Sequence, residues 1–283
     1  MPFERIAVIG AGTMGHGIAQ VSAMAGYETT LYDLTTDALQ AGLDKVRANL
    51  DKGVARGKVT EDQREAALVV LGGTTSMEQA VEGADMVVEA VPERLDLKQS
   101  LFRTVEPLAS PGAVLATNTS SLSVGEIASG TQDPSRVIGT HFFNPVHING
   151  LLEVIHHSGT GNDVIEAIRT YGTRIGKEVV LVRDFPGFAT SRLGVALGME
   201  AIRMVEQGVA SAADIDRAME LGYAHKMGPL RTTDLVGLDV RMHIGAYLAR
   251  ELDNPAFEPP ALMRRMVEEG KLGRKSGEGF YRW

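Results

Sequence analysis

The chain has 283 residues, of which 44% are hydrophobic and 23% are charged, the mix of an ordinary globular protein with room for one large or two smaller domains. Its net charge of −8 and its pI near 5.4 argue against a protein that binds nucleic acid through bulk positive charge. The absence of cysteine excludes disulfides, thiolate nucleophiles and cysteine metal sites, and it suits a reducing compartment.

No apolar stretch reaches the roughly 20 residues that a membrane span needs. A strand-like run begins at residue 3 and leaves no room before it for a signal or transit peptide. We therefore expect a cytoplasmic protein with no membrane partner.

Short apolar runs alternate with longer amphipathic runs over the first two-thirds of the chain. The runs typical of strands are 4–9, 28–32, 85–90, 113–117, 137–141, 151–156 and 178–182. The runs typical of helices are 14–25, 36–56, 60–69, 94–109 and 162–175. This alternation predicts an α/β fold of the Rossmann type, with a doubly wound and mostly parallel sheet.

The pattern changes at Asp184-Phe-Pro-Gly187, after which only helical periodicity remains. The predicted helices are 188–207, 211–221, 234–252 and 260–270, with glycine and proline at their ends. We therefore predict a nucleotide-binding domain over 1–184 and an all-helical domain over 185–283.

The segment Gly10-Ala-Gly-Thr-Met-Gly15 follows a predicted strand and opens a predicted helix. In that context Gly10 permits a tight turn, Gly12 lets the backbone approach a pyrophosphate, and Gly15 allows close packing of helix on strand. Thr13 and Met14 complete the phosphate-binding turn at the helix N-terminus. A glycine-rich turn without a ligand is the alternative for the motif taken alone.

Asp33 ends the second predicted strand, 18 residues beyond Gly15. A carboxylate at this place accepts hydrogen bonds from the adenosine ribose and repels the 2′-phosphate of NADP. Asp33 therefore favours NAD over NADP, although FAD shares the same glycine fingerprint.

His141 and Glu153 are the candidates for proton transfer. His141 ends a predicted strand, where ligands of such sheets bind. Glu153 lies in the apolar strand Leu151-Leu-Glu-Val-Ile155 and needs a partner, because burying an unpaired carboxylate is costly. The alternatives are a structural histidine and an edge strand with Glu153 in water.

Two further groups of polar residues lie near these strands. Asn118-Thr-Ser-Ser121 ends another strand and is suited to bind the nicotinamide ribose or the substrate oxygen, unless it only caps the next helix. Several histidines follow His141, but none has the spacing of a metal site, so we expect no metal.

A series of motifs runs through the chain in a fixed order. They are Gly10-Ala-Gly-Thr-Met-Gly15, Glu89-Ala-Val-Pro-Glu93 with Lys98, Asn118-Thr-Ser-Ser-Leu122, His141-Phe-Phe-Asn-Pro145, Leu152-Glu-Val-Ile155, Pro186-Gly-Phe188, Met227-Gly-Pro229 and Gly273-Arg-Lys-Ser-Gly-Glu-Gly-Phe-Tyr281. Nearly from end to end the chain resembles the short-chain L-3-hydroxyacyl-CoA dehydrogenases, which include bacterial 3-hydroxybutyryl-CoA dehydrogenases. The resemblance implies fatty acid metabolism and β-oxidation.

The resemblance also assigns roles to residues of the chain. It implies that His141 is the base, that Glu153 orients it, and that Ser120 hydrogen-bonds the reacting oxygen of the substrate. The residues that would contact NAD around its nicotinamide end are Glu93, Lys98, Asn144 and Lys275.

In the family the substrate enters a cleft between the domains, and the helical domains form a homodimer. The CoA would lie along the helix of 36–56, where Asn49, Lys52 and Arg56 match the contact region. For these three residues an exposed helix face is the alternative.

Two departures from the family pattern concern the substrate. Ser191 stands where an active-site asparagine would help to hold the acyl carbonyl, and its shorter hydroxyl has a different reach. Asn149-Gly150 replaces a Met-Lys pair, which removes a positive charge. We expect a short-chain (S)-3-hydroxyacyl-CoA as substrate. The alternatives are L-gulonate, carnitine or a pyridine carbaldehyde, and more remotely a non-catalytic NAD-binding protein.

Overall fold

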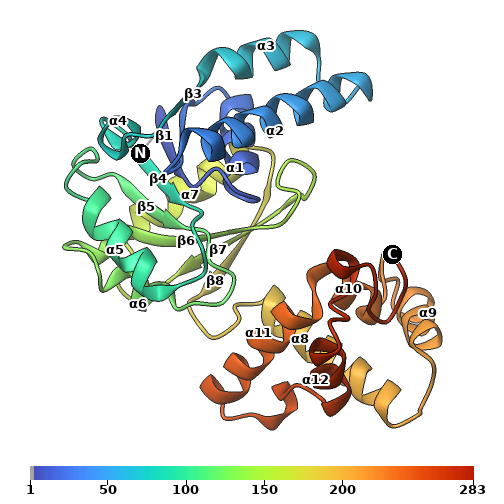
Figure 1. Ribbon diagram of the computed structural model, residues 1–283. Coiled ribbons are helices and arrows are strands. Elements are labelled where there is room, and N and C mark those ends of the chain that lie inside the picture. The colour runs from blue at the N-terminus through green and yellow to red at the C-terminus, as the bar shows by residue number, and fades with distance from the viewer. Residues whose placement is uncertain (1–2) are drawn as a thin grey trace. The chain divides into compact units, whose positions relative to one another are not determined.

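In a computed structural model, residues 3–283 are described, and the chain divides into two compact units between Asp184 and Phe185 (Figure 1). The first unit is built on one eight-stranded sheet, and the second consists of helices and short turns. Within residues 3–283, every helix is too short or too polar to cross a membrane.

The sheet of the first unit has the strand order β3-β2-β1-β4-β5-β6-β7-β8. All neighbouring strands are parallel except β6 and β7. An order of 3-2-1-4-5-6 is that of dinucleotide-binding folds, in which ligands bind at the carboxyl ends of the strands. The strands are β1 (Arg5–Ile9), β2 (Glu28–Tyr32), β3 (Leu71–Thr74), β4 (Met86–Glu89), β5 (Val114–Thr117), β6 (Val137–Phe142), β7 (Leu151–His156) and β8 (Glu178–Arg183).

Helices connect these strands, as parallel pairing requires. They are α1 (Gly15–Met24), α2 (Thr36–Ala55), α3 (Glu61–Val70), α4 (Met77–Val81), α5 (Leu95–Val105), α6 (Val124–Ala128) and α7 (Asn162–Arg174). The connection from β6 to β7 contains none of these helices, and this pair is antiparallel.

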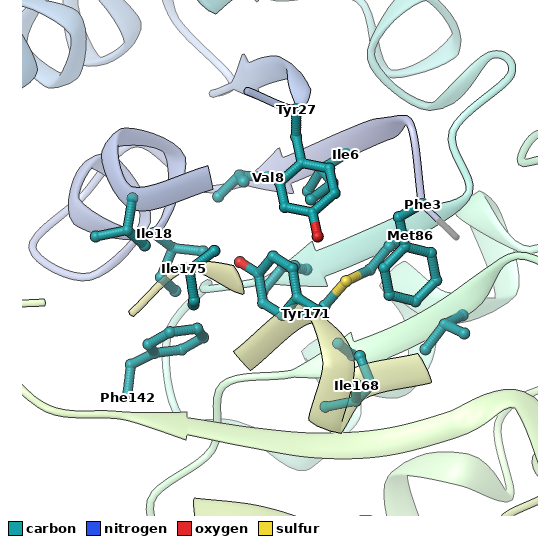
Figure 2. Packing of buried hydrophobic residues seen from close by; sticks show 14 of the residues in the cluster. Phe3, Ile6, Val8, Ile18, Tyr27, Met86, Phe142, Ile168, Tyr171 and Ile175 are labelled. Carbon is teal, nitrogen blue, oxygen red and sulfur yellow. The ribbon is translucent and has the colours of Figure 1, made fainter. Parts of the chain in front are cut away.

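The core of the first unit includes the side chains between the sheet, α1 and α7. Tyr171 of α7 is fully buried, and its hydroxyl lies 2.8 Å from that of Ser22 on α1. Figure 2 shows Tyr171 at the centre of this cluster, between Tyr27 and Ile168. The packing fixes α1 on the sheet and thereby fixes the turn that precedes α1.

The second unit contains α8 (Thr190–Glu206), α9 (Ala212–Gly222), α10 (Pro229–Val236), α11 (Leu238–Glu251) and α12 (Ala261–Glu268) around its own apolar core. Asp234 of α10 is buried and holds the C-terminal segment. Its carboxylate accepts hydrogen bonds from the backbone N–H groups of Phe280 and Tyr281 and from Trp283 Nε1, each at 2.9 Å.

The fold class predicted from the sequence is confirmed, and three features differ from the expected elements. Strand β3 was not predicted, because its residues Leu-Gly-Gly-Thr carry no apolar periodicity. The five-residue helices α4 and α6 were not predicted either. The predicted helix over 234–252 is present as α11 over Leu238–Glu251, but its predicted start is wrong, because Gly237, whose φ is +108°, separates α11 from α10, which begins at Pro229.

Candidate active site

The turn between β1 and α1 has the geometry of a phosphate-binding loop. Gly10 has a φ of +102°, and its N–H donates to the carbonyl of Tyr32 at 2.8 Å. A Cβ on Gly15 would lie 1.6 Å from the carbonyl oxygen of Gly10, so the turn closes only with glycine there. A Cβ on Gly12 would meet nothing within 4 Å, which leaves that side of the loop open to a ligand.

Asp33 is held against this loop. Its Oδ2 accepts the N–H of Ala11 at 2.8 Å, and its Oδ1 accepts the N–H of Leu34 at 2.7 Å. The carboxylate therefore has a fixed position at the end of β2, and a carboxylate has lone pairs beyond those two bonds to offer a ribose. Thr13 is exposed and Met14 is half-buried in the same turn. These residues fit the adenosine half of NAD.

His141 and Glu153 form a buried pair. The antiparallel register of β6 and β7 places the two residues directly opposite each other. His141 Nδ1 lies 2.8 Å from Glu153 Oε2, and the two residues are 6% and 0% exposed. Because β7 lies between β6 and β8, Glu153 is not on a water-facing edge strand, and that alternative is wrong.

The segment after β5 connects to the same edge. Asn118 Oδ1 accepts the N–H of Phe142, the residue after His141, at 3.0 Å. Helix α6 is capped by Ser123, whose hydroxyl accepts the N–H of Glu126. The cap is therefore not supplied by residues 118–121, and the alternative that they serve only as a cap is wrong.

Glu93 and Ser120, both predicted site residues, are brought together. Glu93 Oε1 accepts the N–H of Ser120 at 2.8 Å and the hydroxyl of Thr119 at 2.6 Å. Lys98 lies beneath them, with its side chain fully buried. Its ammonium lies 3.4 Å from Glu93 Oε2 and 2.7 Å from Glu89 Oε1.

Glu89, for which the sequence predicted no role, ends β4 and has no exposed surface. The signal was present, since an acidic residue at the end of the apolar run Met-Val-Val needs a partner for the same reason as Glu153. Thr117, whose hydroxyl donates to Glu89 Oε2 at 2.7 Å, was also missed.

The remaining predicted residues lie elsewhere. Asn144 is exposed in the segment after β6, and Lys52 and Arg56 are exposed at the end of α2. Asn49 of α2 donates to Gln20 Oε1 on α1 at 3.1 Å. In the second unit, Ser191 is half-buried in the first turn of α8, and Lys275 donates to Asp239 at 2.6 Å.

Comparison with known proteins covers the whole chain. The NAD-binding domain of 3-hydroxyacyl-CoA dehydrogenase matches residues 5–185, and the C-terminal domain of the same family matches residues 187–283. A Mycobacterium tuberculosis protein named 3-hydroxybutyryl-CoA dehydrogenase is 43% identical over 282 residues, or 98% of each chain.

Solved structures agree with these matches. FadB2 of M. tuberculosis has a TM-score of 0.96 and 40% identity, with both chains covered completely. (S)-3-hydroxybutyryl-CoA dehydrogenase PaaH1 from Ralstonia eutropha has a TM-score of 0.96 and 35% identity, with 99% of both chains covered. The chain belongs to the 3-hydroxyacyl-CoA dehydrogenase family and is an NAD-dependent oxidoreductase.

Proposed function

We propose that the protein oxidises the 3-hydroxyl of a short-chain (S)-3-hydroxyacyl-CoA, such as 3-hydroxybutyryl-CoA, to the 3-ketoacyl-CoA, and that the reaction is reversible. The observation that carries the proposal is the buried His141–Glu153 pair at the carboxyl edge of β6. An imidazole held by a carboxylate at the ligand-binding edge of the sheet is suited to take a hydroxyl proton.

NAD, when bound, accepts the hydride from C3 of the substrate. His141 takes the proton of the 3-hydroxyl through Nε2, because Nδ1 is hydrogen-bonded to Glu153. The carboxylate of Glu153 then stabilises the imidazolium that forms. Ser120 donates a hydrogen bond to the reacting oxygen and lies in the segment that Glu93 and Asn118 hold at this edge.

The residues proposed for the substrate lie in both units. In the first unit we propose that CoA binds along α2 at Asn49, Lys52 and Arg56, where the two cations suit its phosphates. In the second unit we propose that Ser191, in place of asparagine, binds the acyl carbonyl through its hydroxyl. A hydroxyl has a shorter reach than an amide, so it would bind the carbonyl at closer range or through a bridging water.

A substrate panel tests the proposal. We expect NADH formation from (S)-3-hydroxybutyryl-CoA, inhibition by free CoA, and a loss in kcat on the order of 10²–10⁴ in His141→Ala. Turnover of L-gulonate, carnitine or a pyridine carbaldehyde without inhibition by CoA would contradict the acyl-CoA proposal. Tight NAD binding without turnover of any alcohol or aldehyde would indicate a binding protein instead.

We further propose that the protein acts in the cytoplasm as a homodimer joined through its helical unit. Leu193, Leu221 and Tyr223 of that unit are each more than two-thirds exposed, and apolar side chains of this size are common in interfaces. The lack of cysteine suits a reducing compartment. Light scattering on a sizing column tests the dimer, and a monomeric mass at micromolar concentration would contradict it.

A further inference from the structure

A buried network of charges lies beneath the two segments that follow β4 and β5. Glu89 and Lys98 have no exposed surface, and the Lys98 ammonium lies 2.7 and 2.9 Å from the two oxygens of Glu89. The same ammonium lies 3.4 Å from Oε2 of Glu93, which is 37% exposed. One buried cation is thus shared between an inner and an outer carboxylate.

The inner carboxylate is fully satisfied. Besides Lys98, Glu89 accepts the N–H of Val91 at 2.7 Å and the hydroxyl of Thr117 at 2.7 Å. Burying a charge is costly unless it is paired and hydrogen-bonded, and Glu89 meets both conditions. Glu89 therefore joins the ends of β4 and β5 and fixes the place of the Lys98 ammonium.

The outer carboxylate holds the segment that carries Ser120. Glu93 Oε1 accepts from the Thr119 hydroxyl and from the backbone N–H groups of Ser120 and Ser121, at 2.6, 2.8 and 3.2 Å. Its other oxygen faces Lys98. The position of Glu93 therefore depends on Lys98 on one side and on this segment on the other.

We propose that Glu89 is a positioning residue for the nicotinamide half of the cofactor, and that it acts through Lys98 on Glu93. Strands β1 to β3 form the adenosine half of such a fold, and the strands from β4 onward form the other half. Lys98 has no exposed surface and pairs with both carboxylates, so the Glu89 charge reaches Glu93 through the Lys98 ammonium. The proposal rests on the proposed function for the role of Glu93 and Ser120.

Removing the charge of Glu89 leaves the Lys98 ammonium with one carboxylate partner instead of two. In Glu89→Gln the Lys98 ammonium has Glu93 as its remaining anionic partner, so Glu93 is drawn inward and away from residues 119–121. We expect NADH to bind about tenfold more weakly, because the hydrogen bonds of residues 119–121 to the Glu93 carboxylate would be weakened. Affinity for ADP should stay unchanged, because the glycine loop and Asp33 bind that half and lie on β1 and β2.

Glu106→Gln is the matched control. Glu106 is also buried, and it accepts from Arg136 Nη2 at 2.7 Å and from the N–H groups of Gln132 and Asp133 at 2.7 and 2.9 Å. It follows α5 at the opposite edge of the sheet, where Arg136 also bonds the carbonyl of Ala113 before β5. We expect this variant to lose stability while its affinity for NADH stays unchanged.

A double-mutant cycle with Glu93→Gln separates positioning from general destabilisation. NADH fluorescence titrations should show that Glu89→Gln has no further effect once Glu93 has lost its charge. If Glu89→Gln does not fold, Thr117→Val replaces it as the test variant. It removes the hydrogen bond from the Thr117 hydroxyl to Glu89, and we expect NADH to bind about threefold more weakly.

Three outcomes would overturn the proposal: unchanged NADH affinity in Glu89→Gln, an equal loss of NADH and ADP affinity, or an additive loss in the Glu93→Gln background. These titrations need no turnover. They therefore stay informative even if no acyl-CoA proves to be a substrate, and failure of the proposed function would be seen separately in the substrate panel.

Discussion

In the proposed mechanism, Glu153 determines which nitrogen of His141 takes the substrate proton. A carboxylate 2.8 Å from Nδ1 accepts the proton on that nitrogen, which leaves the lone pair on Nε2. Both residues are buried, so the negative charge of Glu153 acts in a weakly polarisable surrounding where it is strongest. In the proposed mechanism, this charge would stabilise the imidazolium that His141 becomes when it takes the proton.

We predict that Glu153→Gln lowers kcat by about 10²-fold, because the amide keeps the hydrogen bond to His141 but not the charge that stabilises the imidazolium. The measurement is NADH formation from (S)-3-hydroxybutyryl-CoA. NADH affinity should stay within twofold of the wild type. Unchanged kcat would show that the charge of Glu153 plays no part in proton transfer.

For single residues, the sequence predicts some contacts of the site and not others. His141 and Glu153 could be paired from the sequence because each stood out against its strand, one as a histidine at a strand end and the other as a carboxylate among apolar residues. The sequence could not show that Lys98 pairs with both Glu89 and Glu93, because only the fold buries Glu89 completely and leaves Glu93 partly exposed.

Among the elements, the turn from β1 to α1 shows how two glycines of one motif differ. Gly15 has no space for a side chain, since its Cβ would overlap the Gly10 carbonyl. Gly12 has open space around its Cβ position. The fold therefore requires glycine at position 15, whereas at position 12 it leaves room for a side chain, and we attribute Gly12 to the approach of the proposed ligand.

We therefore predict opposite effects of alanine at these two places. Gly15→Ala should lower the thermal midpoint by several degrees, because the loop must open to admit the methyl group. Gly12→Ala should keep the midpoint and weaken NADH binding by about tenfold or more, because the methyl group lies where the pyrophosphate approaches. Calorimetry and NADH titration on both variants check this, and equal losses of stability would contradict it.

The pairing of elements was harder to predict than their existence. A mostly parallel sheet follows from the alternation of strands and helices, but the antiparallel pair does not. The one indication of antiparallel pairing between β6 and β7 is that residues 143–150 are too few for a helical crossover. The predicted helix over 234–252 joined the last residues of α10 to α11, because apolar residues continue across Gly237, whose conformation ends α10.

The whole molecule consists of two units with separate cores. In the second unit the buried carboxylate of Asp234 holds the chain end through Phe280, Tyr281 and Trp283, and buried Asp216 accepts the Tyr281 hydroxyl at 2.6 Å. Gly273 and Gly279 also approach Asp234 so closely that a Cβ on either would overlap it. The C-terminal segment is thus part of the packing of this unit.

We predict that Asp234→Ala lowers the unfolding free energy of the second unit by on the order of 3 kcal/mol, from the loss of three hydrogen bonds to a buried charge. Trp283 is the only tryptophan, so its fluorescence follows this unit in a denaturant titration. Glu258→Gln, which breaks a half-exposed ion pair with Arg264, is the control and should change little. An unchanged fluorescence transition in Asp234→Ala would contradict the prediction.

The antiparallel register of β6 and β7 must form correctly during folding for His141 and Glu153 to meet. A slip of one residue between these strands would turn Glu153 to the opposite face of the sheet and away from His141. The glycine loop and Asp33 would be untouched, since they belong to β1 and β2. A chain misaligned in this way would recognise the nucleotide and yet be inert, so turnover reports the correct alignment of two strands that the cofactor alone does not sense.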